Sequence, residues 1–173
     1  MSELGCTSEL ATLIEAQLGI CDEMIALAER EQQALSRFRP AQLPELLAAQ
    51  DDCAARLTKT QEALDATVRA AADGIGLVAE DDGRGPDVHA LLPHLPLEAR
   101  TRLEALRSAV EARAYTLAVL NAQNALLVRT GLLQVDRTAA VLSSVLGESP
   151  AYGAGGAVRM PTANNTLLLN RQV

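Results

Sequence analysis

Residues 97–147 read LEARTRLEALRSAVEARAYTLAVLNAQNALLVRTGLLQVDRTAAVLSSVLG, with Gly131 as the only breaker before Gly147. Apolar residues recur at steps of three and four, which is the spacing of one face of an amphipathic helix. The first such residues are Leu103, Leu106, Val110, Ala114 and Leu117. A helix of this length would span roughly 75 Å at 1.5 Å per residue. The stretch therefore predicts one long helix.

Two shorter helices are expected before it, at about 8–39 and 43–78. Pro40 and Pro44 separate these two stretches, and the end of the second overlaps the Gly- and Pro-rich connector 73–96. Each has an apolar stripe at the same spacing, with Gln32, Gln50 and Gln61 filling its gaps. The stripes are Ile14, Leu18, Cys21, Ile25, Ala28 and Leu35 in the first, and Leu43, Leu47, Ala54, Leu57, Leu64, Val68, Ala71 and Ile75 in the second. In the connector, Leu91, Leu92, Leu95 and Leu97 are candidates to pack against the helices.

The composition favours helices throughout. The chain of 173 residues has 31 Ala and 29 Leu against 1 Phe, 2 Tyr and no Trp, whereas strands favour β-branched and aromatic residues. We predict an all-α fold: an elongated antiparallel three-helix bundle or coiled coil with a long third helix and a flexible C-terminal tail. The helical domain would be 1–147 and the tail 148–173.

Charge and cysteine content restrict the partners and the compartment. A net charge of −7 disfavours nucleic acid and anionic membranes as partners. Three cysteines without metal-ligand spacing fit a reducing compartment. The N-terminus does not resemble a signal peptide, and no apolar run is long enough to insert into a membrane. We expect a cytoplasmic protein.

A search for chemistry finds no catalytic, cofactor-binding or metal-binding residues to predict, and so no enzyme. A metal site at Asp87, His89 and His94 is the weaker alternative to solvated loop histidines. Gly153, Gly155 and Gly156 lack the strand and helix context of a phosphate-binding loop. The arginines of the third helix (Arg100, Arg102, Arg107 and Arg113) are interpreted as a solvated face paired with the acidic first helix.

The C-terminal part of the long helix is too apolar for a single buried stripe. Its apolar residues are Leu126, Leu127, Val128, Leu132, Leu133, Val135, Ala139, Ala140, Val141, Leu142, Val145 and Leu146. A helix that is apolar on several sides needs covering. A second copy of the chain or another protein's helix would provide it; alternatively, the helix bends at Gly131 and covers itself.

Two further features stand out. Asn121 and Asn124 lie three residues apart on the face of Leu117 and Val128, where buried Asn would fix helix register; a binding site is the alternative. After the helix, Tyr152 lies in the Gly-rich stretch Ala-Tyr-Gly-Ala-Gly-Gly. It is a candidate contact for a partner, although an inert tail fits equally.

The combination of Asn121, Asn124, Leu126 and Leu127 with Tyr152, Gly153 and Gly156 about 25 residues later resembles the FlgN-type flagellar export chaperones. Size, acidity and the two preceding amphipathic helices are similar too. The connector 73–96 and the Asn-rich extension beyond Met160 depart from the family pattern.

The resemblance implies a cytoplasmic chaperone that binds the hook–filament junction proteins FlgK and FlgL, prevents their premature association and delivers them to the export gate. Carried over, the substrate-binding candidates are Leu132, Leu133, Val135, Ala139, Leu142, Val145 and Leu146, and Tyr152 is the gate-docking candidate. The export ATPase complex and a second copy of the chain are further candidate partners. The alternative is a structural self-associating helical bundle, or an adapter without an export role.

Overall fold

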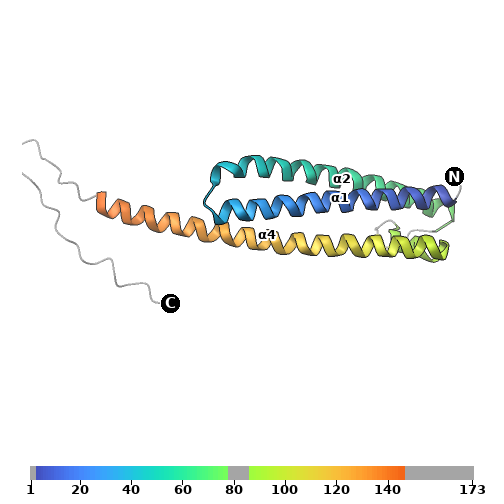
Figure 1. The fold of residues 1–173 in the computed structure, drawn as a ribbon. Coiled ribbons are helices and arrows are strands. Elements are labelled where there is room, and N and C mark those ends of the chain that lie inside the picture. Colours follow the sequence, from blue (N-terminus) through green and yellow to red (C-terminus); the bar gives the residue numbers. More distant parts are fainter. Residues whose placement is uncertain (1–2, 78–85, 147–173) are drawn as a thin grey trace, which may run out of the picture. The chain divides into compact units, whose positions relative to one another are not determined.

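The computed structural model describes residues 3–77 and 86–146. Within these ranges it contains four α-helices, two short 3-10 helices and no strand (Figure 1). The elements are α1 (Glu3–Ser36), η1 (Pro40–Gln42), α2 (Leu43–Gly74), α3 (Val88–Leu91), η2 (Leu92–His94) and α4 (Leu97–Leu146). The predicted all-α fold with a long third helix is confirmed, since α4 has 50 residues against 34 in α1 and 32 in α2.

The described end of the connector, 86–96, contains two short elements that were not predicted, α3 and η2. Asp87 caps α3 by accepting a 2.9 Å hydrogen bond from the Ala90 amide. Leu91 and Leu92 are buried, as predicted. Leu97 is 78% exposed, however, so the prediction that it also packs inward is wrong.

The chain divides into two compact units, Met1–Val128 and Arg129–Val173. The second unit is described as far as Leu146. The predicted domain limit at residue 147 remains a prediction, because 147–173 lie outside the described residues. None of the described helices combines the length and apolarity that crossing a membrane requires.

Side-chain pairs establish the directions of the helices in the first unit. From α1 to α2, Gln17 bonds Gln61, Glu23 bonds Arg56 and Glu31 bonds Gln50, with sequence separations of 44, 33 and 19 residues. The separation shrinks toward the turn, so these two helices are antiparallel. From α1 to α4, the pairs Glu15–Arg102, Asp22–Arg113 and Ala28–Asn124 are separated by 87, 91 and 96 residues. This nearly constant separation means that α1 and α4 run parallel, as an up-down-up bundle requires.

The hydrophobic core of the first unit is concentrated where α1 and α4 begin and α2 ends. The buried cluster there comprises Leu10, Ala11, Ile14, Leu64, Val68, Ala72, Leu91, Leu92 and Leu103. Toward the α1–α2 turn the buried apolar residues are fewer and smaller: Ala28, Ala34, Leu46 and Cys53. Polar side chains complete the helix contacts in that half.

The stripe predicted for α2 is partly wrong. Leu47 is 49% exposed and Ala54 is exposed, whereas the preceding residues Leu46 and Cys53 are buried. Adjacent apolar residues offered two stripes at the same spacing, and a shift of one residue rotates the helix by about 100°. The shifted stripe still contains Gln50, which bonds Glu31 of α1.

Candidate partner-binding surface

In the first unit, Asn124 links α4 to α1 through a buried hydrogen bond. The side chain is 3% exposed. Its Nδ2 donates to the Ala28 carbonyl oxygen at 2.9 Å and to Glu31 Oε2 at 3.1 Å. The same Glu31 oxygen accepts a 2.9 Å bond from Gln50 Nε2 of α2. One carboxylate oxygen therefore connects all three long helices, as a register-setting polar layer should.

Asn121 does not belong to this layer. It is exposed, and the residues of α4 that turn inward beside it are Leu117 and Leu120, both half-buried. The prediction of two asparagines inside the packed stripe is wrong for Asn121. The inward stripe steps by three and then by four, from Leu117 to Leu120 to Asn124, which leaves position 121 at its edge.

Ion pairs cover the outside of the same unit. Arg102 bonds Glu15 at 2.7 Å and Arg113 bonds Asp22 at 3.2 Å, which confirms the predicted pairing of α4 arginines with the acidic first helix. Arg100 and Arg107 instead pair within α4, with Glu104 and Glu111. These contacts are half exposed, so each contributes little to stability.

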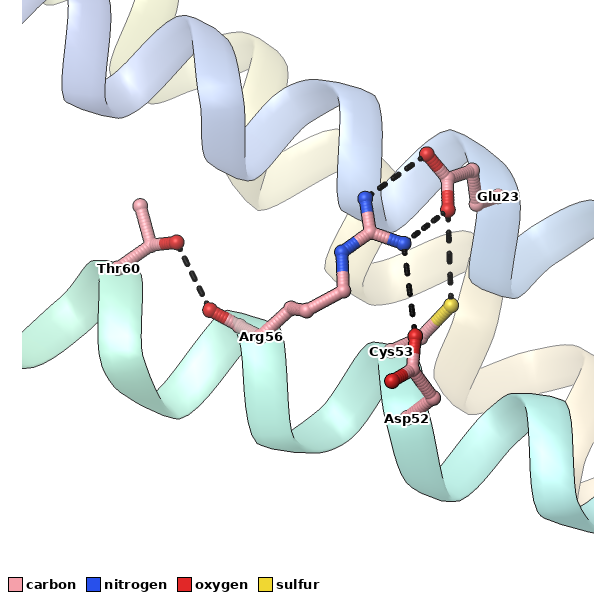
Figure 2. Close-up of polar contacts among 5 residues, drawn as sticks. All are labelled: Glu23, Asp52, Cys53, Arg56 and Thr60. Atoms are coloured by element: carbon pink, nitrogen blue, oxygen red, sulfur yellow. Dashed lines mark hydrogen bonds and ion pairs between the residues drawn. The ribbon is translucent and has the colours of Figure 1, made fainter.

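Figure 2 shows a further polar cluster, which joins α1 to α2 and was not anticipated from the sequence. The Arg56 guanidinium donates to both oxygens of Glu23, at 2.6 and 3.1 Å, and lies 3.8 Å from Asp52. These bonds hold the pKa of the Glu23 carboxyl below its ordinary value. The buried Cys53 thiol is 3.7 Å from Glu23 Oε2, and burial raises its pKa. The cluster thus pairs α1 with α2 through Glu23, Cys53 and Arg56.

The candidate metal ligands lie in the described end of the connector, 86–96. His89 is in α3 and His94 is in η2, and Asp87 uses its carboxylate as the helix cap. Among the residues that the structure describes, no three His, Cys, Asp or Glu side chains are grouped as a metal would require.

The second unit presents large apolar side chains to solvent. Exposed fractions are 61% for Leu132, 54% for Leu133, 65% for Val135, 62% for Val141 and 53% for Leu142. The neighbouring Leu127 and Val128, at the end of the first unit, are 37% and 40% exposed. The described residues leave these side chains much more exposed than those of the buried core.

These exposed residues fall on two sides of the helix. Leu132, Val135, Ala139 and Leu142 follow one another at steps of three, four and three, and they are called the α4 stripe below. Leu133 lies nine residues from Leu142, about two and a half turns away, and so faces the opposite side. Val141 is likewise displaced from Val135, by about 120° at 100° per residue.

Five predicted site residues lie partly or wholly outside what the structure describes. Val145 and Leu146 are within α4, but their side chains are outside the described residues, and so are Tyr152 and the glycines at 153 and 156. The side chain of Leu127 is 37% exposed, and Ala139 is exposed. The structure thus brings Leu132, Val135, Ala139 and Leu142 together on one side and sets Leu133 apart.

Comparison with known proteins gives one match. The sequence model of a protein family described as FlgN protein matches residues 1–159 of the chain. That range includes α1, α2 and α4 and extends past Tyr152. No curated protein and no solved structure matches the chain.

Proposed function

This chain belongs to the FlgN family of flagellar export chaperones, and we propose that in the cytoplasm it binds the junction proteins FlgK and FlgL through the α4 stripe. Binding would cover helical segments of these substrates that otherwise associate prematurely. The complex would then deliver the substrate to the flagellar export gate.

The observation that carries this proposal is the exposed apolar surface of the second unit. Leu132, Val135 and Leu142 are each more than half exposed and repeat at helical spacing. An amphipathic helix of a partner recognises such spacing because its own apolar residues interleave with it. Full burial of a Leu or Val side chain stabilises by roughly 1.5–3 kcal/mol. Several such contacts offset the roughly 4–15 kcal/mol lost on association.

Charge supports a protein partner with an apolar face. The described part of the second unit has only three ionisable side chains, Arg129, Asp136 and Arg137. Long charged patches that would select a polyanion are missing from this stretch. Affinity would come chiefly from apolar burial, and it would depend weakly on salt.

Tyr152 completes the proposal as the residue that docks the loaded chaperone at the export gate. It is one of only three aromatic residues in the chain, and aromatic side chains are frequent anchors of protein interfaces. Tyr152→Ala is expected to leave substrate binding unchanged and to reduce secretion. Unaltered secretion would remove Tyr152 from the mechanism.

Deletion of residues 132–173 tests the proposal as a whole. We expect the truncated chain to keep α1 and α2 folded, by circular dichroism, and to lose co-purification with FlgK and FlgL. Retained co-purification would contradict the assignment of the surface.

The same exposed stripe also favours a second candidate, a self-associating bundle in which two copies cover each other. Light scattering of the purified chain, alone and with each junction protein, separates the two functions. A chaperone exchanges any self-contact for the substrate, whereas a structural dimer keeps its mass and ignores the junction proteins.

A further inference from the structure

The turn between α1 and α2 has the sequence Arg37-Phe38-Arg39-Pro40, and its only aromatic residue is the single Phe of the chain. Phe38 is 82% exposed, the largest exposed fraction among the large apolar side chains described. A large aromatic group in water contributes nothing to the core. Its position therefore needs another explanation.

The backbone conformation at Phe38 is also unusual for a residue other than glycine. Phe38 has a φ of 53°, in the left-handed region that favours glycine. It occupies the position after the C-cap in a Schellman motif, in which its amide donates to Leu35 O at 3.2 Å and the Arg39 amide donates to Ala34 O at 2.8 Å. Glycine or asparagine is usual at this position.

The end of α2 provides an internal comparison. There Gly76, with a φ of 70°, has the same position in the same motif, since it donates to Asp73 O and Leu77 donates to Ala72 O. Leu77 then packs against the core, as is common for the residue after the glycine. At α1 the corresponding residues are an exposed Phe and an exposed Arg. The end of α1 thus lacks the glycine and the packed apolar residue that complete the same motif at the end of α2.

The two sequence neighbours of Phe38, Arg37 and Arg39, line a cavity of about 260 Å³ together with Arg30. Leu46 and Glu45, the one acid among the lining residues, also contribute, whereas Phe38 itself does not line the cavity. In the described part of the chain, none of these three arginines takes part in an ion pair, unlike Arg56, Arg100, Arg102, Arg107 and Arg113. Guanidinium groups bind carboxylates in a planar, two-bonded geometry.

We propose that Phe38 and the arginine-lined cavity of the α1–α2 turn form a second docking surface, for an acidic segment of a partner protein that carries an apolar side chain. The arginines would pair with its carboxylates, and the Phe38 ring would cover its apolar group. This surface lies in the first unit and is independent of the α4 stripe, so it does not rest on the function proposed above.

The net charge of the chain favours an acidic polypeptide over nucleic acid or an anionic membrane as the partner of this surface. The chain has a net charge of −7, which repels the extended negative charge of nucleic acid or an anionic membrane at long range. Three arginines around a small cavity match a few carboxylates at close range, where the repulsion of the distant acids is screened over about 8–10 Å. A polypeptide with a short acidic stretch meets both conditions.

Fluorescence anisotropy with the full chain tests the proposal. The probe is a labelled peptide, Asp-Glu-Leu-Asp-Glu-Phe-Asp-Glu, and its uncharged counterpart, Asn-Gln-Leu-Asn-Gln-Phe-Asn-Gln. We expect saturable binding of the acidic peptide alone, weakened by added salt. The double substitution Arg37→Gln with Arg39→Gln should weaken it about ten-fold or more, the cost typical of an important interface residue. Arg100→Gln with Arg107→Gln changes the net charge equally in α4 and should leave binding within about two-fold.

Substitutions at Phe38 separate a docking role from a structural one. Phe38→Gly and Phe38→Asn both suit the left-handed backbone and should abolish peptide binding. Phe38→Gly should also raise the melting temperature, by about 2–4 °C. Phe38→Trp should retain binding.

Four results would overturn the proposal: equal binding of the uncharged peptide, no saturable binding of the acidic one, stronger binding to duplex DNA or phosphatidylglycerol vesicles, or a lower melting temperature for Phe38→Gly.

Discussion

Asn124 Nδ2 donates a 2.9 Å hydrogen bond to the carbonyl oxygen of Ala28, and this buried contact joins α4 to α1 across 96 residues of sequence. The other amide atom, Asn124 Oδ1, is buried and has no hydrogen-bond partner among the described residues. Turning the amide over would place Oδ1 against the oxygens of Ala28 and Glu31, so the observed orientation is the favourable one.

Asn124→Ala should therefore destabilise the chain by about 1–3 kcal/mol, because it removes one buried and one partly buried hydrogen bond and opens space between the helices. Urea unfolding measures the change. Asn121→Ala is the matched control in the same helix: Asn121 is exposed, and its change should stay within about 0.5 kcal/mol. Equal effects at the two positions would contradict the role of the polar layer.

The pairing of Glu23 with Arg56 predicts a pH dependence. The folded-state pKa of Glu23 is lowered, chiefly by the hydrogen bonds from Arg56. A lowered carboxyl pKa stabilises the fold above the unfolded value of about 4.3. That contribution is lost as pH falls through the folded pKa. In an NMR titration, Arg56→Gln should return the Glu23 pKa toward its ordinary value, and an unchanged titration would show that the pair is not formed in solution.

The three cysteines should react at different rates. Burial raises the pKa of the Cys21 and Cys53 thiols, and both are buried in the first unit. Cys6 is half-buried and its pKa is also raised by burial. With iodoacetamide at neutral pH, mass spectrometry should find Cys6 alkylated first, because reagent access decides among three weakly ionised thiols. Simultaneous labelling of all three would mean that the bundle opens readily.

A substitution at Gly131 tests whether α4 bends at this residue. It lies inside the continuous helix α4, and a Cβ built there meets no atom within 4 Å. Gly131→Ala should stabilise the helix by about 0.5–1 kcal/mol, seen as slower amide hydrogen exchange around residue 131. Loss of substrate binding in this variant would instead support a bend at Gly131.

Much of the fold is predictable from the sequence because Ala, Leu and the three-and-four spacing all favour the same helices. The spacing does not decide between adjacent stripes when both offer Leu or Ala, which is why Leu46 replaces Leu47 in the core. Asn124 and Asn121 differ in burial for a related reason, because contacts with α1 decide which of two neighbouring positions on α4 is covered.

The candidate site was predicted less completely. Exposed apolar residues in the second unit follow from the surplus of Leu and Val in the sequence, but the separation of Leu133 from the α4 stripe requires helix geometry. Phe38 was overlooked, although scarcity of aromatic residues, the signal that singled out Tyr152, applies to it equally. Its left-handed backbone is visible only in the structure.

The central claim, that the α4 stripe binds the junction proteins, is tested most directly by calorimetric titration of FlgK with two matched double variants. Val135→Asn with Leu142→Asn alters the stripe. Leu133→Asn with Val141→Asn makes the same two changes away from it, at side chains whose exposures of 54% and 62% match the 53% of Leu142 and the 65% of Val135.

Loss of two buried apolar side chains from an interface costs roughly 3–6 kcal/mol, so the stripe variant should bind FlgK at least about 100-fold more weakly. The control should remain within about five-fold of the unaltered chain. Equal affinities for the two variants, or undiminished binding by the stripe variant, would contradict the claim.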